Sequence, residues 1–195
     1  MPLQAFEYRM TEEEYLAFEE KSPVRHEYLG GYIHAMVGGT RAHNGIAVNL
    51  LVALKQQLRG SPCQVFMNDI KVKVKRESSY YYPDLVVTCD PREAKLDRGL
   101  VLEFPCLIVE VLSPSTQKTD EREKWRAYQT LDSLQEYVLI DYQRIHATIH
   151  RRAQVGWIRV ELFENDSLSL DSVDFSERLR DIYDGIEFPE SSEET

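Results

Sequence analysis

Residues 107–112 read Leu-Ile-Val-Glu-Val-Leu, an apolar run with a single acid, Glu110, in its middle. A short run of this kind is typical of a strand that is buried on both faces of a sheet. An ionised carboxylate in such a strand costs several kcal/mol unless a positive group pairs with it. Glu110 therefore indicates either a buried ion pair with Lys or Arg, or a site that binds a cation.

A second carboxylate stands at the start of another apolar strand. Residues 82–87 read Tyr-Pro-Asp-Leu-Val-Val, with Asp84 directly before the apolar part. By itself, an aspartate after a proline is a common turn residue. Two carboxylates delivered by neighbouring core strands, however, can converge on one cation, and hard divalent ions prefer oxygen ligands. The pair Asp84 and Glu110 thus points to a metal site.

The composition is that of an ordinary globular domain, with 195 residues, 43% apolar and 29% charged. We expect a single domain over residues 1–188, followed by an acidic, serine-containing tail over residues 189–195 that is too polar to fold. The longest apolar run is far below the roughly 20 residues that span a bilayer. Because no basic and apolar leader opens the sequence, we expect a cytoplasmic protein without a membrane partner.

The net charge of −10 argues against a protein that coats nucleic acid, since such proteins usually present a basic surface. It does not exclude a nuclease, because metal ions and a local group of lysines can contact phosphate. The charge therefore restricts the mode of nucleic-acid binding but leaves metal-dependent enzymes open.

The three cysteines, Cys63, Cys89 and Cys106, lack the CxxC spacing of metal and redox motifs. Cys89 and Cys106 lie in or beside apolar strands, where a free cysteine behaves as a small hydrophobic residue. We therefore expect the cysteines to pack in the core rather than to bind a metal or take part in redox chemistry.

Hydrophobic periodicity and turn residues divide the chain into a series of helices and strands. The expected elements are a helix from the capping box at Thr11 to about residue 20, a hairpin over 25–37 with its turn at Gly30-Gly31, a helix over 42–59, a strand over 70–75 with one lysine face, strands at Asp84 and Glu110, a helix over 120–130, a strand over 136–141, a hairpin through 145–163 and a last helix over 176–183. This order predicts an α/β fold with a central mixed β-sheet flanked by helices.

A magnesium-dependent phosphodiesterase needs carboxylate oxygens around a hard cation, and a cation or base near the attacking water. Asp84 and Glu110 meet the first need, and the backbone carbonyl of Val111 is a further oxygen at the same strand. Glu27, in the early hairpin, is a candidate third carboxylate or water-positioning group. Its alternative is an ordinary hairpin glutamate.

Several segments resemble the Uma-two family of restriction-endonuclease-like proteins. They are residues 25–31 (Arg-His-Glu-Tyr-Leu-Gly-Gly), 82–84 (Tyr-Pro-Asp), 109–116 (Val-Glu-Val-Leu-Ser-Pro-Ser-Thr), Asp120, Lys124 and Tyr128, and residues 136–141. The resemblance covers nearly all of residues 10–185, and its most specific part is residues 105–141. It implies a branch of the PD-(D/E)xK nuclease superfamily, with a restriction-endonuclease-like fold, Mg²⁺ or Mn²⁺ held by Asp84 and Glu110, cleavage of DNA, and a homodimer.

The sequence departs from the superfamily pattern at Leu112, where a lysine is expected two residues after the strand carboxylate. Lys124 is the first candidate replacement, because the helix after the strand can reach back over its end. Lys73, on an adjacent strand, is the second. For both lysines a solvated position is the alternative. His43, at the start of the long helix, matches a histidine of the family and is a candidate for phosphate contact or proton transfer; its alternative is an ordinary polar residue at a helix N-terminus.

Two hypotheses of different class follow from these residues. The first is a Mg²⁺- or Mn²⁺-dependent endonuclease that hydrolyses DNA phosphodiester bonds. The second is a catalytically silent nuclease-like domain that acts as a nucleic-acid-binding or regulatory module. Leu112 and the acidic composition favour the second, while the pair Asp84 and Glu110 favours the first.

Overall fold

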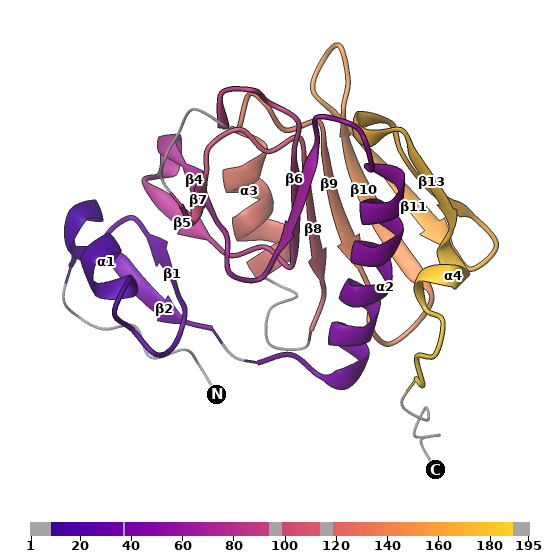
Figure 1. Ribbon diagram of the computed structural model, residues 1–195, viewed down its shortest axis with the longest axis horizontal. Coiled ribbons are helices and arrows are strands. Elements are labelled where there is room, and N and C mark those ends of the chain that lie inside the picture. Colours follow the sequence, from indigo (N-terminus) through magenta and orange to yellow (C-terminus); the bar gives the residue numbers. More distant parts are fainter. Residues whose placement is uncertain (1–8, 37, 94–98, 114–118, 189–195) are drawn as a thin grey trace.

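The computed structural model describes residues 9–36, 38–93, 99–113 and 119–188. Within these residues the chain forms a six-stranded sheet, a five-stranded sheet and a two-stranded hairpin, with helices packed against them (Figure 1). The expected tail over residues 189–195 lies outside the described residues. The expectation of an α/β fold with a central mixed sheet is confirmed.

The larger sheet is mixed, and two of its neighbouring inner strands carry the acids singled out above: Asp84 stands directly before one strand, and Glu110 lies within the other. Strands β8 and β9 run parallel, whereas every other neighbouring pair in this sheet is antiparallel. In spatial order the strands are β11 (Trp157–Phe163), β10 (His146–Arg152), β9 (Glu136–Ile140), β8 (Leu107–Val111), β6 (Leu85–Thr88) and β3 (Gln64–Met67). The apolar run around Glu110 is therefore an inner strand, as its composition predicts.

The smaller sheet is built mainly from the N-terminal part of the chain. Its spatial order is β2 (Tyr32–Ala35), β1 (His26–Leu29), β5 (Ser79–Tyr81), β4 (Lys71–Val74) and β7 (Val101–Leu102), with a short 3₁₀ turn η1 (Lys75–Glu77) between β4 and β5. Helix α1 (Glu12–Glu19) begins at Thr11 with the expected capping box. The hairpin of β1 and β2 turns at Gly30 and Gly31, both with positive φ, which favours glycine.

Helix α2 (Arg41–Gln57) lies along one face of the larger sheet (Figure 1). Its side chains Ile46, Leu50 and Leu54 are fully buried there, each worth about 2 kcal/mol of apolar burial. The alternation of β8 sends Val109 to this side, while Glu110 points to the opposite face, between the two sheets. The helical period of α2 and the two-residue period of β8 together decide where the acid lies.

The second face of the larger sheet is covered by the segment predicted as a helix over residues 120–130. It forms in two parts, a π-helical turn η3 (Thr119–Lys124) and a short α-helix α3 (Trp125–Tyr128). Tyr128 is fully buried against the core on this face. A π-helical turn is rare and is often found at functional sites.

The predicted helix over residues 176–183 is wrong in its first half. Phe175–Arg178 forms strand β13, which pairs with β12 (Ser167–Leu170) across the turn η4 (Asp171–Val173), and α4 (Leu179–Ile182) is one turn long. The reason is that Leu168, Leu170 and Phe175 all face the core from this hairpin. Their burial satisfies a two-residue period that outweighs the helical spacing of Leu179 and Ile182.

The strand over residues 70–75 is confirmed as β4, but Lys71 and Lys73 are covered rather than left to solvent. Lys71 is 6% exposed, and its ammonium donates to the hydroxyl of Tyr82 at 3.2 Å. Lys73 pairs with Glu12 of α1. Helix α1 packs on this side of the sheet and brings the carboxylate that the lysine needs.

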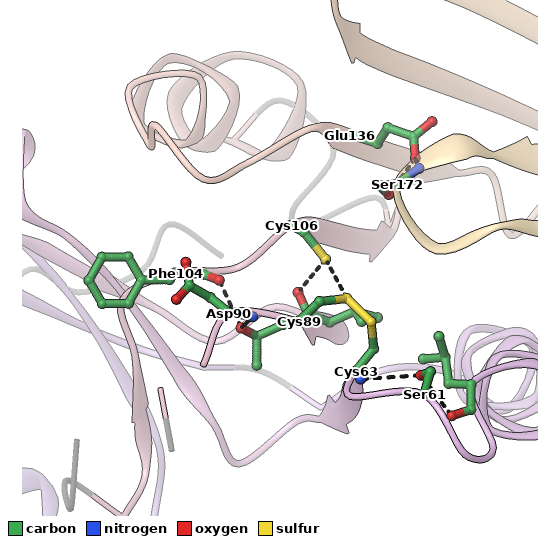
Figure 2. The surroundings of a disulfide bond; sticks show 11 residues. Ser61, Cys63, Cys89, Asp90, Phe104, Cys106, Glu136 and Ser172 are labelled. Atoms are coloured by element: carbon green, nitrogen blue, oxygen red, sulfur yellow. Dashed lines mark hydrogen bonds between the residues drawn. A yellow bond between two sulfur atoms is a disulfide. The ribbon is translucent and has the colours of Figure 1, made fainter. Parts of the chain in front are cut away.

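The expectation that the cysteines only pack in the core is wrong for two of them. Cys63 and Cys89 form a disulfide, and the free thiol of Cys106 lies 3.6 Å from the sulfur of Cys89 (Figure 2). The cause is the register of β3 against β6, which was not predicted because β3 was not recognised. Gln64 opposes Thr88, so the next residue outward on each strand is a cysteine, with Cα atoms 4.0 Å apart.

Candidate active site

Asp84 and Glu110 lie side by side because β6 and β8 are antiparallel neighbours, with Leu85 opposite Val109. The backbone N–H of Asp84 donates to Oε2 of Glu110 at 3.4 Å. In return, the backbone N–H of Val111 donates to Oδ2 of Asp84 at 2.7 Å. Each carboxylate is thus held by the backbone of the other strand, which fixes their separation.

The ammonium of Lys124 lies among three carboxylates that come from different elements. Its Nζ is 3.0 Å from Glu27 of β1, 3.1 Å from Glu110 of β8 and 3.1 Å from Asp120 of η3. Lys124 is 5% exposed, so these contacts are shielded from water. The lysine therefore joins both sheets and the π-helical turn at a single point.

The turn η3 places Asp120 and Lys124 on the same side, four residues apart. The carbonyl of Asp120 accepts a hydrogen bond from the hydroxyl of Tyr137 at 3.0 Å, which anchors the start of the turn. The hydroxyl of Tyr128 donates to Oε1 of Glu110 at 3.3 Å. One carboxylate oxygen of Asp120, Oδ1, is buried and, within the described residues, accepts no hydrogen bond although Lys124 is near.

His43 reaches the same cluster from the first turn of α2. The hydroxyl of Thr40 accepts a hydrogen bond from the backbone N–H of His43 at 3.2 Å and caps the helix. Nε2 of the ring lies 3.1 Å from Oδ2 of Asp84. A Cβ atom at Gly39 would come within 2.6 Å of Nδ1 of His43, so glycine leaves the room that the imidazole occupies.

The electrostatics of the cluster are dominated by burial and by an excess of acids. Burial raises the pKa of Glu110 well above its usual value; Asp120, Asp84 and Glu27 raise it further, and Lys124 opposes them only in part. Burial alone would lower the pKa of Lys124, but its surrounding carboxylates outweigh this and raise it.

The pKa of His43 is set by the same opposing effects of burial and nearby acids. Burial lowers its pKa, yet the carboxylate of Asp84 and the carbonyl of Val111 reverse this, and the pKa lies above its ordinary value. Four carboxylates, from Glu27, Asp84, Glu110 and Asp120, thus share one lysine and one histidine within contact distance. Such an arrangement favours the entry of another positive charge.

A cleft of about 400 Å³ opens onto these groups. Its lining includes the acids Asp84, Glu110 and Asp120 together with Lys124. Polar side chains that also line it are Arg25, His43, Asn44, Asn68, Asp69 and Tyr82. The cleft therefore reaches this cluster, although Glu110 and Asp120 are almost fully buried, and polar groups around it can donate hydrogen bonds.

Of the residues proposed from the sequence, the structure brings together Glu27, Asp84, Glu110, Lys124 and His43. Lys73 lies elsewhere. Its ammonium pairs with Glu12 and lies 5.4 Å from the ring centre of Tyr80. Lys124, the other proposed replacement, contacts Glu110 directly. Leu112, at the position of the superfamily lysine, is 8% exposed and packs in the core around α3.

Two contributors were not assigned a role from the sequence, namely Asp120 as an acid of the cluster and Tyr128 as a donor to Glu110. Their spacing of four residues from Lys124 on either side is the signal that places all three on one helical face. Within the described residues, no three His, Cys, Asp or Glu side chains are arranged so that they alone would hold a metal ion. The ammonium of Lys124 occupies the point where three of the carboxylates meet.

The mixed sheets and flanking helices form a restriction-endonuclease-like fold. A crystal structure described as "a putative nuclease belonging to DUF820" from Anabaena variabilis superposes with a TM-score of 0.74, covering 90% of this chain and 98% of that chain at 17% identity. The family model Uma2, described as "Putative restriction endonuclease", matches residues 12–179. The chain belongs to this family.

Two proteins of Synechocystis sp., both described as uncharacterized, are similar in sequence. The protein slr1290 is 35% identical over 181 residues, which cover 92% of this chain and 94% of its own. The protein sll1609 is 32% identical over 132 residues, or 68% and 75% of the two chains. Among the described residues of the present chain, no helix is both long and apolar enough to cross a membrane.

Proposed function

We propose that this protein is a Mg²⁺- or Mn²⁺-dependent endonuclease that hydrolyses phosphodiester bonds of DNA. The observation that carries the proposal is the meeting of Asp84, Glu110 and Lys124 at the floor of an open cleft. Paired acids and a protonated lysine are the groups that a metal-dependent phosphodiesterase requires. Membership of the Uma2 family supports the same class of reaction.

The residues fit a hard divalent cation. All of the nearby acidic donors are oxygens, and within the described residues the buried Oδ1 of Asp120 has only the shared ammonium of Lys124 beside it, at 3.1 Å, so the cluster holds more acceptors than its own donors satisfy. Asp84 and Glu110 would hold the ion, with Glu27 as a third carboxylate. Mg²⁺ usually takes one or two protein carboxylates and keeps several waters, so a complete protein cage is not needed. When bound, the ion would polarise the phosphoryl oxygen and activate a water.

The remaining groups have roles that follow from their positions. Lys124 stays protonated because three carboxylates surround it, and its charge would stabilise the extra negative charge of a pentavalent phosphate. His43 holds Asp84 from the side of α2 and can donate to a phosphate oxygen in the cleft. The bound cation together with Lys124, rather than the net charge of the chain, would attract the phosphate backbone.

The test is nicking of supercoiled plasmid DNA with Mg²⁺ or Mn²⁺, and with EDTA as the blank. Asp84→Asn and Glu110→Gln keep the shape of each side chain and remove its charge, so we expect each to lower the rate at least about 100-fold. Glu136→Gln is the matched control, because Glu136 is an equally buried strand acid that pairs with Arg151 outside the cleft. Equal rates in wild type and both cleft variants would reject the proposal.

The competing function is a silent nuclease-like module, and one observation favours it. Lys124 is already neutralised by three acids, as in a purely structural ion cluster. That module would bind DNA in a shift assay without cutting it, and Mn²⁺ would show no binding to the wild-type protein by calorimetry. The endonuclease predicts Mn²⁺ binding that weakens at least about 10-fold in Asp84→Asn.

A further inference from the structure

Strand β11 is an edge of the larger sheet. It has seven residues and, within the described residues, pairs only with β10. Large apolar side chains are open to solvent along it, with Ile158 54% and Phe163 59% exposed. A long edge strand with exposed apolar residues is a ready template for pairing with another strand.

The backbone groups that point away from β10 can be assigned from the hairpin. The N–H of Ala153 donates to the carbonyl of Gly156, so this pair closes the turn, and bonded and non-bonded pairs then alternate along the ladder. Trp157, Arg159 and Glu161 fall on non-bonded pairs, and their N–H and C=O groups point outward. No hydrogen bond to these groups is formed by any of the residues that the structure describes.

We propose that β11 pairs antiparallel with β11 of a second copy of this chain, centred on Val160, and thereby forms a homodimer with one continuous sheet. In this register Arg159 of each copy lies opposite Glu161 of the other. Both pairs bring outward-pointing backbone groups together, so each exchanges two hydrogen bonds. Arg159 already contacts Glu161 of its own strand, which places both charges on one face.

Charge selects this register over its neighbours. A slip by two residues would put Arg159 opposite its own copy, or Glu161 opposite its own copy, and like charges directly opposite are destabilising. Arg159 and Glu161 are therefore complementary to the same two residues of a second copy when the strands pair in this register.

The apolar residues support the same pairing. Ile158 of one copy faces Leu162 of the other, and Trp157 faces Phe163, so the most exposed side chains of the strand become covered. The N–H of Phe163 is already bonded to Asp166 at 2.8 Å, but its carbonyl is open to the N–H of Trp157 in the second copy. All four of these apolar residues thus gain a cross-strand contact that the isolated chain lacks.

The dimer would leave the cleft open. Strand β8, which carries Glu110, is separated from β11 by β9 and β10. The inference does not depend on the proposed nuclease activity, since the assembly is measured without substrate.

The first test is the mass in solution of a charge-reversal series, by light scattering during gel filtration. Wild type is expected at twice the chain mass of 22.7 kDa. Arg159→Glu and Glu161→Arg should each fall to the single mass, and the double reversal should restore the dimer. Arg59→Glu, the same charge change at the end of α2, should stay dimeric. A monomeric wild type, or single reversals that remain dimeric, would overturn the proposal.

The second test does not depend on the folding of charge variants. In a Cys106→Ser background, Val160→Cys should form a disulfide-linked dimer under mild oxidation, because facing Cα atoms of such a pair lie about 4.5 Å apart. Ile158→Cys is the control, since its two copies would lie roughly 13 Å apart along the strands. Equal cross-linking of both variants, or none in Val160→Cys, would overturn the proposed register.

Discussion

Strands β6 and β8 carry opposite kinds of chemistry at their two ends. At one end the disulfide partner Cys89 and the thiol of Cys106 are neighbours. At the other end Asp84 and Glu110 face each other beside Lys124. At the first end a disulfide links the residue after β6 to the residue before β3 among apolar side chains. At the second end charged side chains lie in the interior, where charges are normally excluded.

The difference separates what stabilises the fold from what serves the site. A disulfide restricts the unfolded chain and so raises stability whatever the activity. Buried charges must be desolvated, and their attraction often only balances that cost. Buried charged groups that carry this cost are candidates for function, so substitution at the acid end should abolish activity, whereas substitution at the sulfur end should lower stability and leave activity unchanged.

The largest expected effect is at the acid end, from Lys124→Met. This variant keeps the bulk of the side chain but leaves Glu27, Glu110 and Asp120 without their shared ammonium. Removal of one partner from a buried ion cluster costs about 3–5 kcal/mol of unfolding free energy. Plasmid nicking should be lost as well.

Chemical denaturation checks the stability of this variant, with Lys73→Met as the control, because Lys73 pairs outside the cluster. If Lys124→Met were no less stable than Lys73→Met, the cluster would not be held by its lysine.

The next effect is at the sulfur end, from the double variant Cys63→Ser/Cys89→Ser. Opening a cross-link of 26 residues should lower the unfolding free energy by about 3 kcal/mol. Nicking at a temperature well below unfolding should be unchanged, because the disulfide lies at the far end of the strands from the acids. Denaturation with and without dithiothreitol measures the effect in wild type, and the double variant should not respond to the reductant.

A smaller effect, of opposite sign, is expected from Glu110→Gln. Because Glu110 is buried among other acids, removal of its charge relieves repulsion, while the single amide oxygen can still accept from Tyr128 and Lys124 and only the long 3.4 Å contact with the N–H of Asp84 is lost. We expect stability to rise by about 1 kcal/mol while nicking is lost. A loss of stability similar to that of Lys124→Met would show that the acid is a structural partner and not a functional one.

The smallest effect concerns the reactivity of Cys106. Burial raises the pKa of its thiol to about 11. The thiolate is the reactive form and is scarce below that pH, so alkylation at pH 8 should be about 100-fold slower than for an ordinary thiol. The rate should rise about tenfold per pH unit until it levels near the pKa. Mass spectrometry after timed iodoacetamide treatment measures this, and rapid labelling at pH 8 would contradict it.

How much could be predicted differs between local and long-range features. The capping box at Thr11, the turn at Gly30 and the buried strand around Glu110 were predicted because each depends on neighbouring residues alone. The proximity of Asp84 and Glu110 could be predicted because each stands on a short apolar segment typical of a core strand, and such strands were expected to be neighbours. These features can be predicted because each is encoded by a short stretch of neighbouring residues.

The features that were missed depend on pairing across the chain. The disulfide needs the register of β3 with β6, and β3 is too short and polar at its start to be recognised. Strand β13 forms because it pairs with β12, and neither segment by itself indicates this pairing. The contact of Glu27 with Lys124 joins two sheets, so only the folded chain reveals that the lysine lies among the acids.

The central claim is that Asp84 and Glu110 hold a divalent cation in the cleft beside Lys124. Its most direct test is an anomalous difference map from crystals soaked in Mn²⁺. We expect one peak within about 2.0–2.4 Å of carboxylate oxygens from both Asp84 and Glu110. A map without an anomalous peak at this site, with Lys124 still in contact with Glu110 at high Mn²⁺, would contradict the claim.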